Sequence, residues 1–260
     1  SRATYSTLTG TFMGPWLEIA ECNGGTINPN YNQVRGVEGY GTRTGRLSSD
    51  HPNGQNIPGD QGIDYFGDTF PQMRAYCLPD HGQVWVSVDF KSQEPRLTAH
   101  FEDGRLLQAY VDDPDLDPYQ FVTDIVGGDV TRKDSKAILL GLIYSMGAQV
   151  LADKIGCSYE RATALRNAIR AALPDVNQLD RDCKKRFDLG LPIRTLGGRI
   201  CNCEPPSGGR SWSYKALNLL IQGSAADQTK EAIIFADEDL TAQDFESRLL
   251  GTVQDEINIS

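Results

Sequence analysis

Two acidic residues, each beside a short apolar run, are the residues of this sequence best suited to bind divalent metal ions. Asp89 lies near the end of the run Gln83–Phe90, and Asp255 lies in Gly251–Ser260 beside a second acid, Glu256. Two carboxylates can hold two Mg²⁺ ions about 3.5–4 Å apart, which activate an attacking oxygen and stabilise a leaving oxygen in a displacement at phosphorus. Either acid alone is more often a turn residue than a ligand. The pair predicts phosphoryl transfer if the fold brings the two acids together.

A segment with helical periodicity, Thr131–Ser145, carries the cations that such chemistry needs. Residues spaced by four lie on one stripe of a helix surface. Like charges at this spacing destabilise an isolated helix by about 0.2–0.5 kcal/mol, and an anion bound across both would reverse that effect. A triphosphate fits this role; the alternative is an amphipathic helix with a solvated basic edge. The stripe consists of Arg132, Lys136, Leu140 and Tyr144.

The charge of the chain is unevenly distributed. The formal net charge is −10, which by itself argues against contact with phosphate. Residues Arg132 to Lys215, however, contain 15 Lys and Arg against 8 Asp and Glu. A basic lobe that faces nucleic acid is therefore compatible with the acidic total, and solvated basic helix faces are the alternative.

The elements that must position these residues can be read from the pattern. Residues 83–90 form a β-branched and aromatic run typical of a buried strand, and a helix opens at Glu94–Pro95. The first sixty residues, rich in Gly, Asn, Thr and Pro, predict turns and short strands. Helical segments are predicted near 106–111, 119–126, 131–145, 148–155, 159–172 and 176–189, followed by a hairpin or loop at 191–199 and 205–210, a long helix at 214–237 and a short helix at 241–250.

The last ten residues predict a strand, a tight turn with two acids and the start of a returning strand. A chain that ended there would leave an unpaired edge, so the sequence reads as a fragment. No apolar run approaches the ~18 residues of a membrane span, and the N-terminus lacks a signal-peptide pattern, so we expect an intracellular protein without membrane contact. The six cysteines are expected to be free thiols; a zinc site at Cys201 and Cys203 is the remote alternative.

Five segments together resemble the family A DNA polymerases. Val88–His100, in which Glu94 follows Asp89 by five positions, is similar to the first palm motif of that family, and Val253–Glu256 to the second. The stripe in 131–145 is similar to the fingers helix. The segments 44–49 and 52–58 resemble the part of the family that contacts primer-template, and Asn218 to Asp227 resembles its long palm helix.

This resemblance implies a role for each matching residue. Asp89 and Asp255 would hold two Mg²⁺ ions, with Glu256 as a supporting acid. Arg132 and Lys136 would bind the triphosphate of a deoxynucleotide, and Lys136 would protonate the pyrophosphate leaving group. Leu140 and Tyr144 would contact the nucleotide, and Glu94 with Tyr144 would exclude a ribose 2′-hydroxyl. The residues implied to contact primer-template DNA, from the minor-groove side, are Arg46, Gln55, Asn56, Asn218, Gln222 and Gln254.

Three departures from the family pattern concern single residues. Gln254 stands where the family commonly has His, although its amide can still donate a hydrogen bond to the primer terminus. Leu140 replaces the usual aromatic residue of the fingers helix, which removes the flat face for stacking. Ser145 replaces a usual Gly at the end of that helix.

The resemblance predicts an α+β right-hand polymerase core with an antiparallel palm sheet and a helical fingers subdomain, without the thumb and the C-terminal palm strand. The predicted division is an N-terminal palm portion in 1–105, fingers in 106–199, and a C-terminal palm portion in 200–260. Alternatives remain open: a single-subunit RNA polymerase, a non-catalytic nucleic-acid-binding module, and a helical interaction domain. The wording Ser92-Gln-Glu-Pro95 favours a phage source over a bacterial one.

Overall fold

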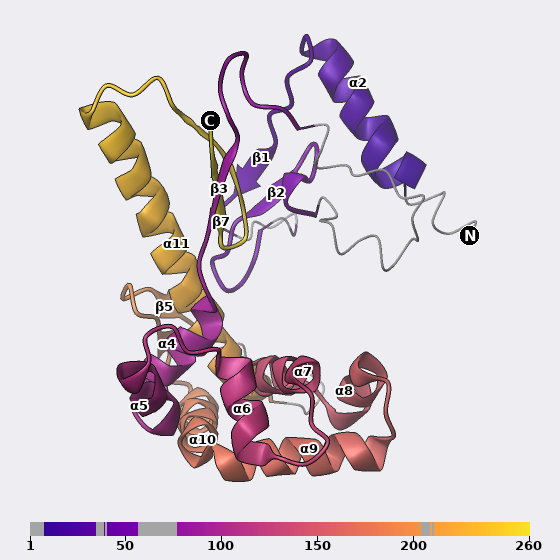
Figure 1. Ribbon diagram of the computed structural model, residues 1–260, viewed down its shortest axis with the longest axis vertical. Helices are drawn as coiled ribbons and strands as arrows, with labels where there is room; N and C mark the ends of the chain where they lie inside the picture. The colour runs from indigo at the N-terminus through magenta and orange to yellow at the C-terminus, as the bar shows by residue number, and fades with distance from the viewer. Residues whose placement is uncertain (1–7, 35–38, 40, 57–76, 204–208, 210) are drawn as a thin grey trace. The chain divides into compact units, whose positions relative to one another are not determined.

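The computed structural model describes residues 8–34, 39, 41–56, 77–203, 209 and 211–260. The chain packs into two compact units, one of Ser1–Asp89 with Thr229–Ser260 and the other of Phe90–Gln228 (Figure 1). These boundaries differ from the predicted division at 105/106 and 199/200. The reason is packing, because Leu97 and Leu217, which flank the predicted fingers, belong to one core cluster with Phe187.

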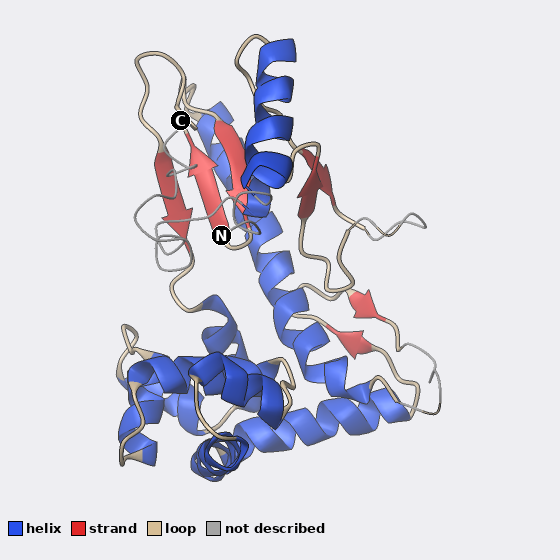
Figure 2. Ribbon diagram, turned by 90° about the vertical axis from the view of Figure 1, so that its right-hand side faces the viewer, coloured by secondary structure: helices blue, strands red, loops and turns tan. Residues whose placement is uncertain are grey.

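The first unit contains a three-stranded antiparallel sheet in the order β3–β7–β6 (Figure 2). A separate pair of antiparallel strands, β1 and β2, precedes it in the chain. The strands are β1 (Asn30–Asn32), β2 (Ser48–Asp50), β3 (Val86–Asp89), β6 (Leu249–Val253) and β7 (Glu256–Ile259). The helical elements are the π-helix η1 (Leu8–Met13), α2 (Gly14–Cys22), the 3₁₀ turn η2 (Gly54–Asn56) and the C-terminal part of α11 (Ala216–Ala242).

The last strand, β7, is the central strand of this sheet. It pairs with β6 on one side and with β3 on the other, in antiparallel register on both sides. The unpaired edge expected for this last strand is therefore not found on β7. A strand that is distant in sequence, β3, supplies the second set of hydrogen bonds, which local patterns do not reveal.

The outer edge of β6 is held by a tyrosine from β1. The Tyr31 hydroxyl donates to the backbone oxygen of Thr252 at 3.2 Å and accepts from its backbone N–H at 3.1 Å. Edge strands present such groups without a strand partner, and Tyr31 satisfies both. Gly251 allows this approach, since a Cβ at that position would lie 2.8 Å from the Tyr31 hydroxyl. The β1–β2 pair is thereby fixed to the hairpin that carries Asp255.

The second unit is helical, with one short antiparallel hairpin. The six helical segments predicted between 106 and 189 are all present. Its helices are α4 (Gln93–Glu102), α5 (Arg105–Asp112), α6 (Pro118–Val126), α7 (Arg132–Ile143), α8 (Ala148–Ile155), α9 (Tyr159–Ala172) and α10 (Pro174–Asp188), and its remaining elements are β4 (Ile193–Arg194), β5 (Ile200–Cys201), the 3₁₀ turn η4 (Ser213–Lys215) and the first part of α11. Helices and small antiparallel sheets together confirm the α+β class.

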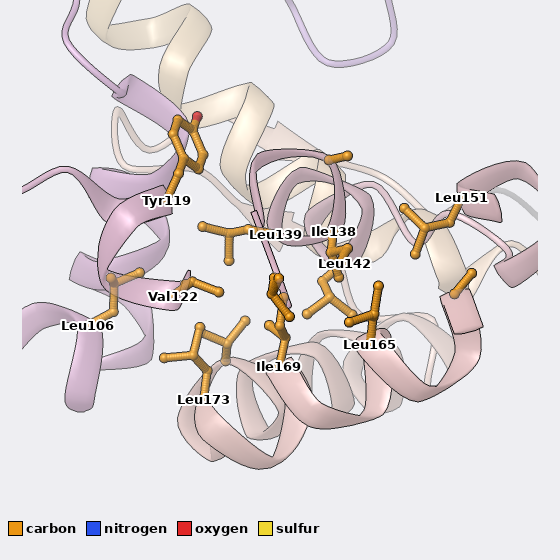
Figure 3. Packing of buried hydrophobic residues seen from close by; sticks show 14 of the residues in the cluster. Leu106, Tyr119, Val122, Ile138, Leu139, Leu142, Leu151, Leu165, Ile169 and Leu173 are labelled. Carbon is orange, nitrogen blue, oxygen red and sulfur yellow. The ribbon is translucent and has the colours of Figure 1, made fainter. Parts of the chain in front are cut away.

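Two hydrophobic clusters stabilise the helical unit. In the first, α5, α6, α7 and α9 contribute fully buried side chains such as Leu106, Val122, Ile138 and Ile169 (Figure 3). The second joins α4, the end of α7, α10 and α11 through Leu97, Ile143, Phe187, Leu217 and Ile221. Because α7 contributes to both clusters, its orientation within this unit is fixed along its whole length.

Two sequence-based expectations about helices are wrong. The separate helix predicted at 241–250 is not formed; α11 instead continues to Ala242 and is followed by Asp244 in the left-handed conformation at φ 54°. Phe245 N–H bonds to Leu240 O and Asp244 N–H to Thr241 O, the pattern of a Schellman motif. In the first sixty residues, α2 was not expected, although Pro15 in its first turn is a helix-start signal.

Three other expectations concern membrane spans, the cysteines and the hairpin after residue 190. No helix in the described part of the chain is long and apolar enough to cross a membrane. All six cysteines are free thiols, as predicted. The predicted hairpin after residue 190 is present as β4 and β5, while residues 205–208 and 210 lie outside the described residues.

Replacing Tyr31 by Phe tests whether its hydroxyl braces β6. We expect Tyr31→Phe to lower the free energy of unfolding by about 1–3 kcal/mol, because two backbone groups of Thr252 lose their partner. Denaturant titration of both proteins measures the difference. The matched control is Tyr214→Phe, since the Tyr214 ring is 43% exposed. Equal losses in the two variants would contradict a specific role for the Tyr31 hydroxyl.

Candidate functional site

The strand register of the first unit brings Asp89 and Asp255 together. In the β3–β7 ladder, Asp89 lies directly opposite Glu256, and Asp255 is the residue before Glu256. Directly opposed residues of an antiparallel pair have Cα atoms about 4.5–5.5 Å apart. The two acids predicted to converge are therefore neighbours in the backbone although 166 positions separate them.

A two-residue turn carries Asp255. Val253 pairs with Glu256 across the β6–β7 hairpin, so Gln254 and Asp255 form the loop between them. Gln254 is exposed and has φ 58°, a left-handed conformation typical of such hairpin loops. The prediction of a turn that carries two acids needs one correction, because Glu256 is already the first residue of β7. Its side chain consequently shares a sheet face with Asp89.

The juxtaposition of these acids fits a divalent cation. Like charges directly opposed on one face of an antiparallel pair are destabilising, and a bound cation offsets that repulsion. No group of three or more His, Cys, Asp or Glu side chains is placed to hold a metal ion within the described ranges. Mg²⁺ does not require such a group, because it binds through one or two carboxylates together with waters and substrate phosphates. Asp89 and Asp255 meet this requirement, whereas a zinc site at Cys201 and Cys203 does not fit.

A polar ladder on the same face fixes β3 against β7. Asn258 is 4% exposed, and its Oδ1 accepts from Ser87 Oγ at 2.6 Å and from Trp85 Nε1 at 2.8 Å. Ser87 and Asn258 are opposed in the register, two residues before Asp89 and two after Glu256. A slip of one residue would break these bonds and turn Asp89 to the other face. The ladder therefore specifies where the first carboxylate points.

The remaining first-unit candidates lie around β2. The Arg46 backbone oxygen accepts the Thr42 hydroxyl at 2.7 Å, which closes a turn just before that strand. The Gln55 backbone N–H donates to Ser49 Oγ and to Asn53 Oδ1, both at 3.1 Å. The buried Gln55 Nε2 has no hydrogen-bond partner among the described residues. Asn56 lies in η2, while Ile57 and Pro58 of the same predicted segment lie outside the described residues.

In the second unit, the predicted stripe is the accessible side of α7. Arg132 and Lys136 are exposed, Leu140 and Tyr144 are partly exposed, and the other positions from 137 to 143 are buried. The helix starts with a capping box between Thr131 and Asp134. Leu140 packs beside both core clusters, so it is neither a core residue nor fully exposed.

The backbone at the end of α7 shows what the replacement of a usual Gly by Ser145 costs. Ser145 has φ 51°, and Met146 N–H bonds to Gly141 O while Ser145 N–H bonds to Leu142 O. This Schellman-type end needs a left-handed residue, which Gly adopts without the cost of about 1–2 kcal/mol that other residues incur. A glycine would suit this position, and Ser145 introduces strain at the end of the stripe.

A residue not identified from the sequence, Asp117, pairs with Arg132. Arg132 Nε donates to Asp117 Oδ2 at 2.5 Å. Asp117 also caps α6, accepting from the backbone N–H of Tyr119 and of Gln120. Burial raises the pKa of Asp117, but the hydrogen bonds from Arg132 and these amides outweigh it and leave the pKa below its ordinary value. The carboxylate is therefore ionised at neutral pH.

The Tyr119 ring lies beneath both cations of the stripe. Arg132 Cζ is 5.4 Å and Lys136 Nζ is 5.6 Å from its centroid. A cation over an aromatic face is attracted to it, which offsets the repulsion between two cations one helical turn apart. The signals for Asp117 and Tyr119 are visible in hindsight, since Asp117-Pro118 is a helix-start pattern. Their pairing with α7 is a tertiary contact that the sequence does not show.

Glu94 and Tyr144 meet as expected. The Tyr144 hydroxyl donates to Glu94 Oε2, and Glu94 is buried in the first turn of α4. The preceding residue, Gln93, donates through Nε2 to Ala225 O at 3.3 Å and to Gln228 Oε1 at 3.1 Å. The position of Glu94 is thus fixed from α7 and from α11.

The long helix α11 carries Asn218 and Gln222 as partly exposed residues between buried ones. Farther along, Asp227 accepts from Arg199 Nε at 2.9 Å and also bonds to the Thr195 hydroxyl. Arg199 Nη2 also donates to Gly223 O at 2.6 Å. These bonds tie the β4–β5 hairpin to α11, and they account for Asp227 in the predicted palm-helix segment as a structural residue.

Comparisons with known proteins agree on one family. A sequence model of DNA polymerase family A matches residues 3–260. The DNA-directed DNA polymerase of Pseudomonas phage M6 is 32% identical over 266 residues, which cover 81% of this chain and 39% of the phage protein. DNA polymerase I of Caldicellulosiruptor bescii is 29% identical over 267 residues, covering 98% of this chain and 30% of that protein.

A solved structure gives the same result. The POL domain of Pol1 from M. smegmatis, in complex with DNA primer-template and dNTP, matches with a TM-score of 0.77 and 26% sequence identity. The match covers 95% of this chain and 43% of that one. The chain thus spans about two fifths or less of the relatives named here.

The pair formed by Asp117 and Arg132 can be tested with an inorganic anion. We expect Asp117→Asn to tighten the binding of tripolyphosphate up to about fivefold, the factor for about 1 kcal/mol, because a competing anion is removed from Arg132. Asn also accepts hydrogen bonds at a helix start, so α6 keeps its cap. Titration calorimetry measures the affinity.

Tyr119→Phe is the matched control, because it keeps the ring beneath Arg132 and Lys136 and should leave this affinity unchanged. Weaker binding by Asp117→Asn would show the opposite role, in which Asp117 orients the guanidinium for the anion.

Proposed function

Because this chain belongs to DNA polymerase family A, we propose that it carries the catalytic core of a template-directed polymerase that adds deoxynucleotides to a primer 3′-hydroxyl. The observation that carries the proposal is the β3–β7 register, which sets Asp89 opposite Glu256 and beside Asp255. The family membership decides against the single-subunit RNA polymerase and the helical interaction domain. A catalytically silent relative remains the alternative that experiment must exclude.

The proposal assigns the palm to the sheet β3–β7–β6 and the fingers to the helices between 106 and 199. The catalytic acids then belong to the first compact unit, and the cations of α7 belong to the second.

Asp89 and Asp255 hold two Mg²⁺ ions in this proposal, with Glu256 as a supporting acid. When bound, two such ions would supply activation of the primer 3′-oxygen and stabilisation of the leaving oxygen of pyrophosphate. Arg132 and Lys136 bind the triphosphate, and the ammonium of Lys136 donates a proton to the departing pyrophosphate. The resting partner of Arg132, Asp117, is displaced as the triphosphate arrives.

The DNA contacts are assigned to polar side chains from both units. They approach the minor groove, whose acceptor pattern is similar for all base pairs, so they test the shape of the primer terminus and not its sequence. Gln254 reaches the primer terminus through its amide. The remaining contacts are Arg46, Gln55, Asn56, Asn218 and Gln222.

Selection of the sugar is assigned to Glu94 with Tyr144. Their hydrogen bond fixes the carboxylate, and a fixed, buried side chain excludes an added hydroxyl better than a mobile one. Leu140 lies one turn before Tyr144 on the same stripe and contacts the nucleotide without offering a flat stacking face.

The catalytic proposal is tested by neutralising each acid. We expect Asp89→Asn and Asp255→Asn in the intact protein each to lower Mg²⁺-dependent primer extension by about a hundredfold or more, the scale for removing a group that stabilises transition-state charge. Affinity for primer-template should change little, because neither acid is assigned to the DNA. Extension is measured by single-turnover kinetics and affinity by fluorescence anisotropy.

Asp237→Asn is the matched control, because it removes the same charge from an exposed position on α11. It should retain full activity. Extension by Asp89→Asn at the rate of the unmodified protein, or its absence from the unmodified protein, would overturn the proposal.

The role proposed for Glu94, exclusion of a ribose 2′-hydroxyl, predicts a change in the selectivity for the sugar. Glu94→Ala should raise the ratio of ribonucleotide to deoxynucleotide incorporation by about tenfold or more, the factor for about 1.4 kcal/mol. Tyr144→Phe keeps the ring but removes the bond to Glu94, so it should give a smaller increase. Competition assays on one primer-template measure both ratios. An unchanged ratio in Glu94→Ala would contradict this role for Glu94.

A further inference from the structure

A stripe of polar residues runs along the start of α11 on a side that is otherwise buried. The 3₁₀ turn η4 continues into α11 without a break, because Ala216 has helical dihedrals of φ −61° and ψ −46°. Residues four positions apart therefore lie on one stripe: Tyr214, Asn218 and Gln222. The residues at 216, 217 and 219–221 are buried.

The stripe has unused hydrogen-bonding capacity. Neither Asn218 nor Gln222 forms a side-chain hydrogen bond with any residue that the structure describes, and Asn218 Oδ1 is itself buried. A buried acceptor in a native structure normally has a donor, supplied by protein, water or ligand. The stripe therefore has the properties of a surface that meets a polar partner.

An aromatic and cationic cluster begins the stripe. The ring centroids of Trp212 and Tyr214 are 5.9 Å apart at an interplanar angle of 46°. Lys215 Nζ lies 3.9 Å from the Trp212 centroid and 5.8 Å from the Tyr214 centroid. Trp212 packs against the second core cluster, whereas Tyr214 is 43% exposed. The anchored Trp212 and the lysine thus support a ring that solvent, or a ligand, can reach.

We propose that Tyr214 is a stacking platform for an unpaired base of the template strand, with Lys215 beside it for the adjoining phosphate. An aromatic face next to a cation is how proteins bind single-stranded nucleic acid, because every base has a stacking face and every nucleotide has a phosphate. A base within a duplex is already stacked on its neighbours, so the platform acts on single-stranded template. The site rests on the proposed function, since it continues the stripe assigned to primer-template.

The charge of the surrounding segment favours an anionic partner, as nucleic acid is. Residues Arg132 to Lys215 carry 15 Lys and Arg against 8 Asp and Glu, in a chain with a net charge of −10. The platform lies at the end of this basic segment. Electrostatic attraction to phosphate would bring the strand near, and stacking would then hold a base.

The test compares two DNA molecules and two variants of the intact protein. On a primer-template with a single-stranded 5′ template overhang, Tyr214→Ala should bind about fivefold or more weaker than the unmodified protein. On blunt duplex the two should bind equally. Tyr214→Phe keeps the ring and should match the unmodified protein on both DNAs. Anisotropy titrations without nucleotide or metal measure these affinities.

Two further measurements distinguish the contribution of base stacking to affinity from that of the phosphate contact. Abasic nucleotides in the overhang should lower the affinity of the unmodified protein for this DNA and leave the affinity of Tyr214→Ala unchanged. Lys215→Gln should reduce the slope of log affinity against log salt by about 1, as expected for one phosphate contact. Equal affinities of Tyr214→Ala and the unmodified protein for overhang DNA, or equal losses on blunt duplex, would overturn the platform. Because these are binding measurements, they can fail while Mg²⁺-dependent extension succeeds, so the two proposals are tested separately.

Discussion

The register of β7 between β6 and β3 is the constraint on which the rest of the candidate site depends. Asp255 is placed by the β6–β7 hairpin and Asp89 by the β3–β7 ladder, so one strand positions both acids. Asn258 and Ser87 specify that register through a partly buried hydrogen bond. Side chains alternate between the faces of a strand, so a shift by one residue would separate the acids completely.

The helical unit holds charged and polar side chains on helices whose other residues are mostly buried. On α7 from Lys136 onward and at the start of α11, the accessible residues recur every four positions, and most of the intervening residues belong to the core clusters. Core packing fixes each helix, and the stripe is the side that packing leaves accessible. The residues proposed to bind the nucleotide and the DNA gain their rigidity from this arrangement.

The cations of α7 are also held by partners that the proposed reaction does not use directly. Asp117 pairs with Arg132, and the Tyr119 ring lies under Arg132 and Lys136. These contacts offset the repulsion between two like charges on adjacent turns. In the proposed function, an incoming triphosphate would exchange one anion for another at Arg132, which would limit the net gain in binding energy.

The sequence by itself identified the residues proposed for the site and located most of the helices. Helical periodicity located α5 to α10, since a helix is made from neighbouring residues, and motif spacing pointed to Asp89, Arg132, Lys136 and Asp255. Tertiary structure alone decided contacts between distant segments. It placed residues 249 and 250 in a strand where the sequence predicted the end of a helix, because β7 supplies hydrogen bonds to β6, and it paired Asp117 with Arg132 and Tyr31 with Thr252. Such pairings depend on segments that are separate in the sequence meeting in space, which local sequence does not encode.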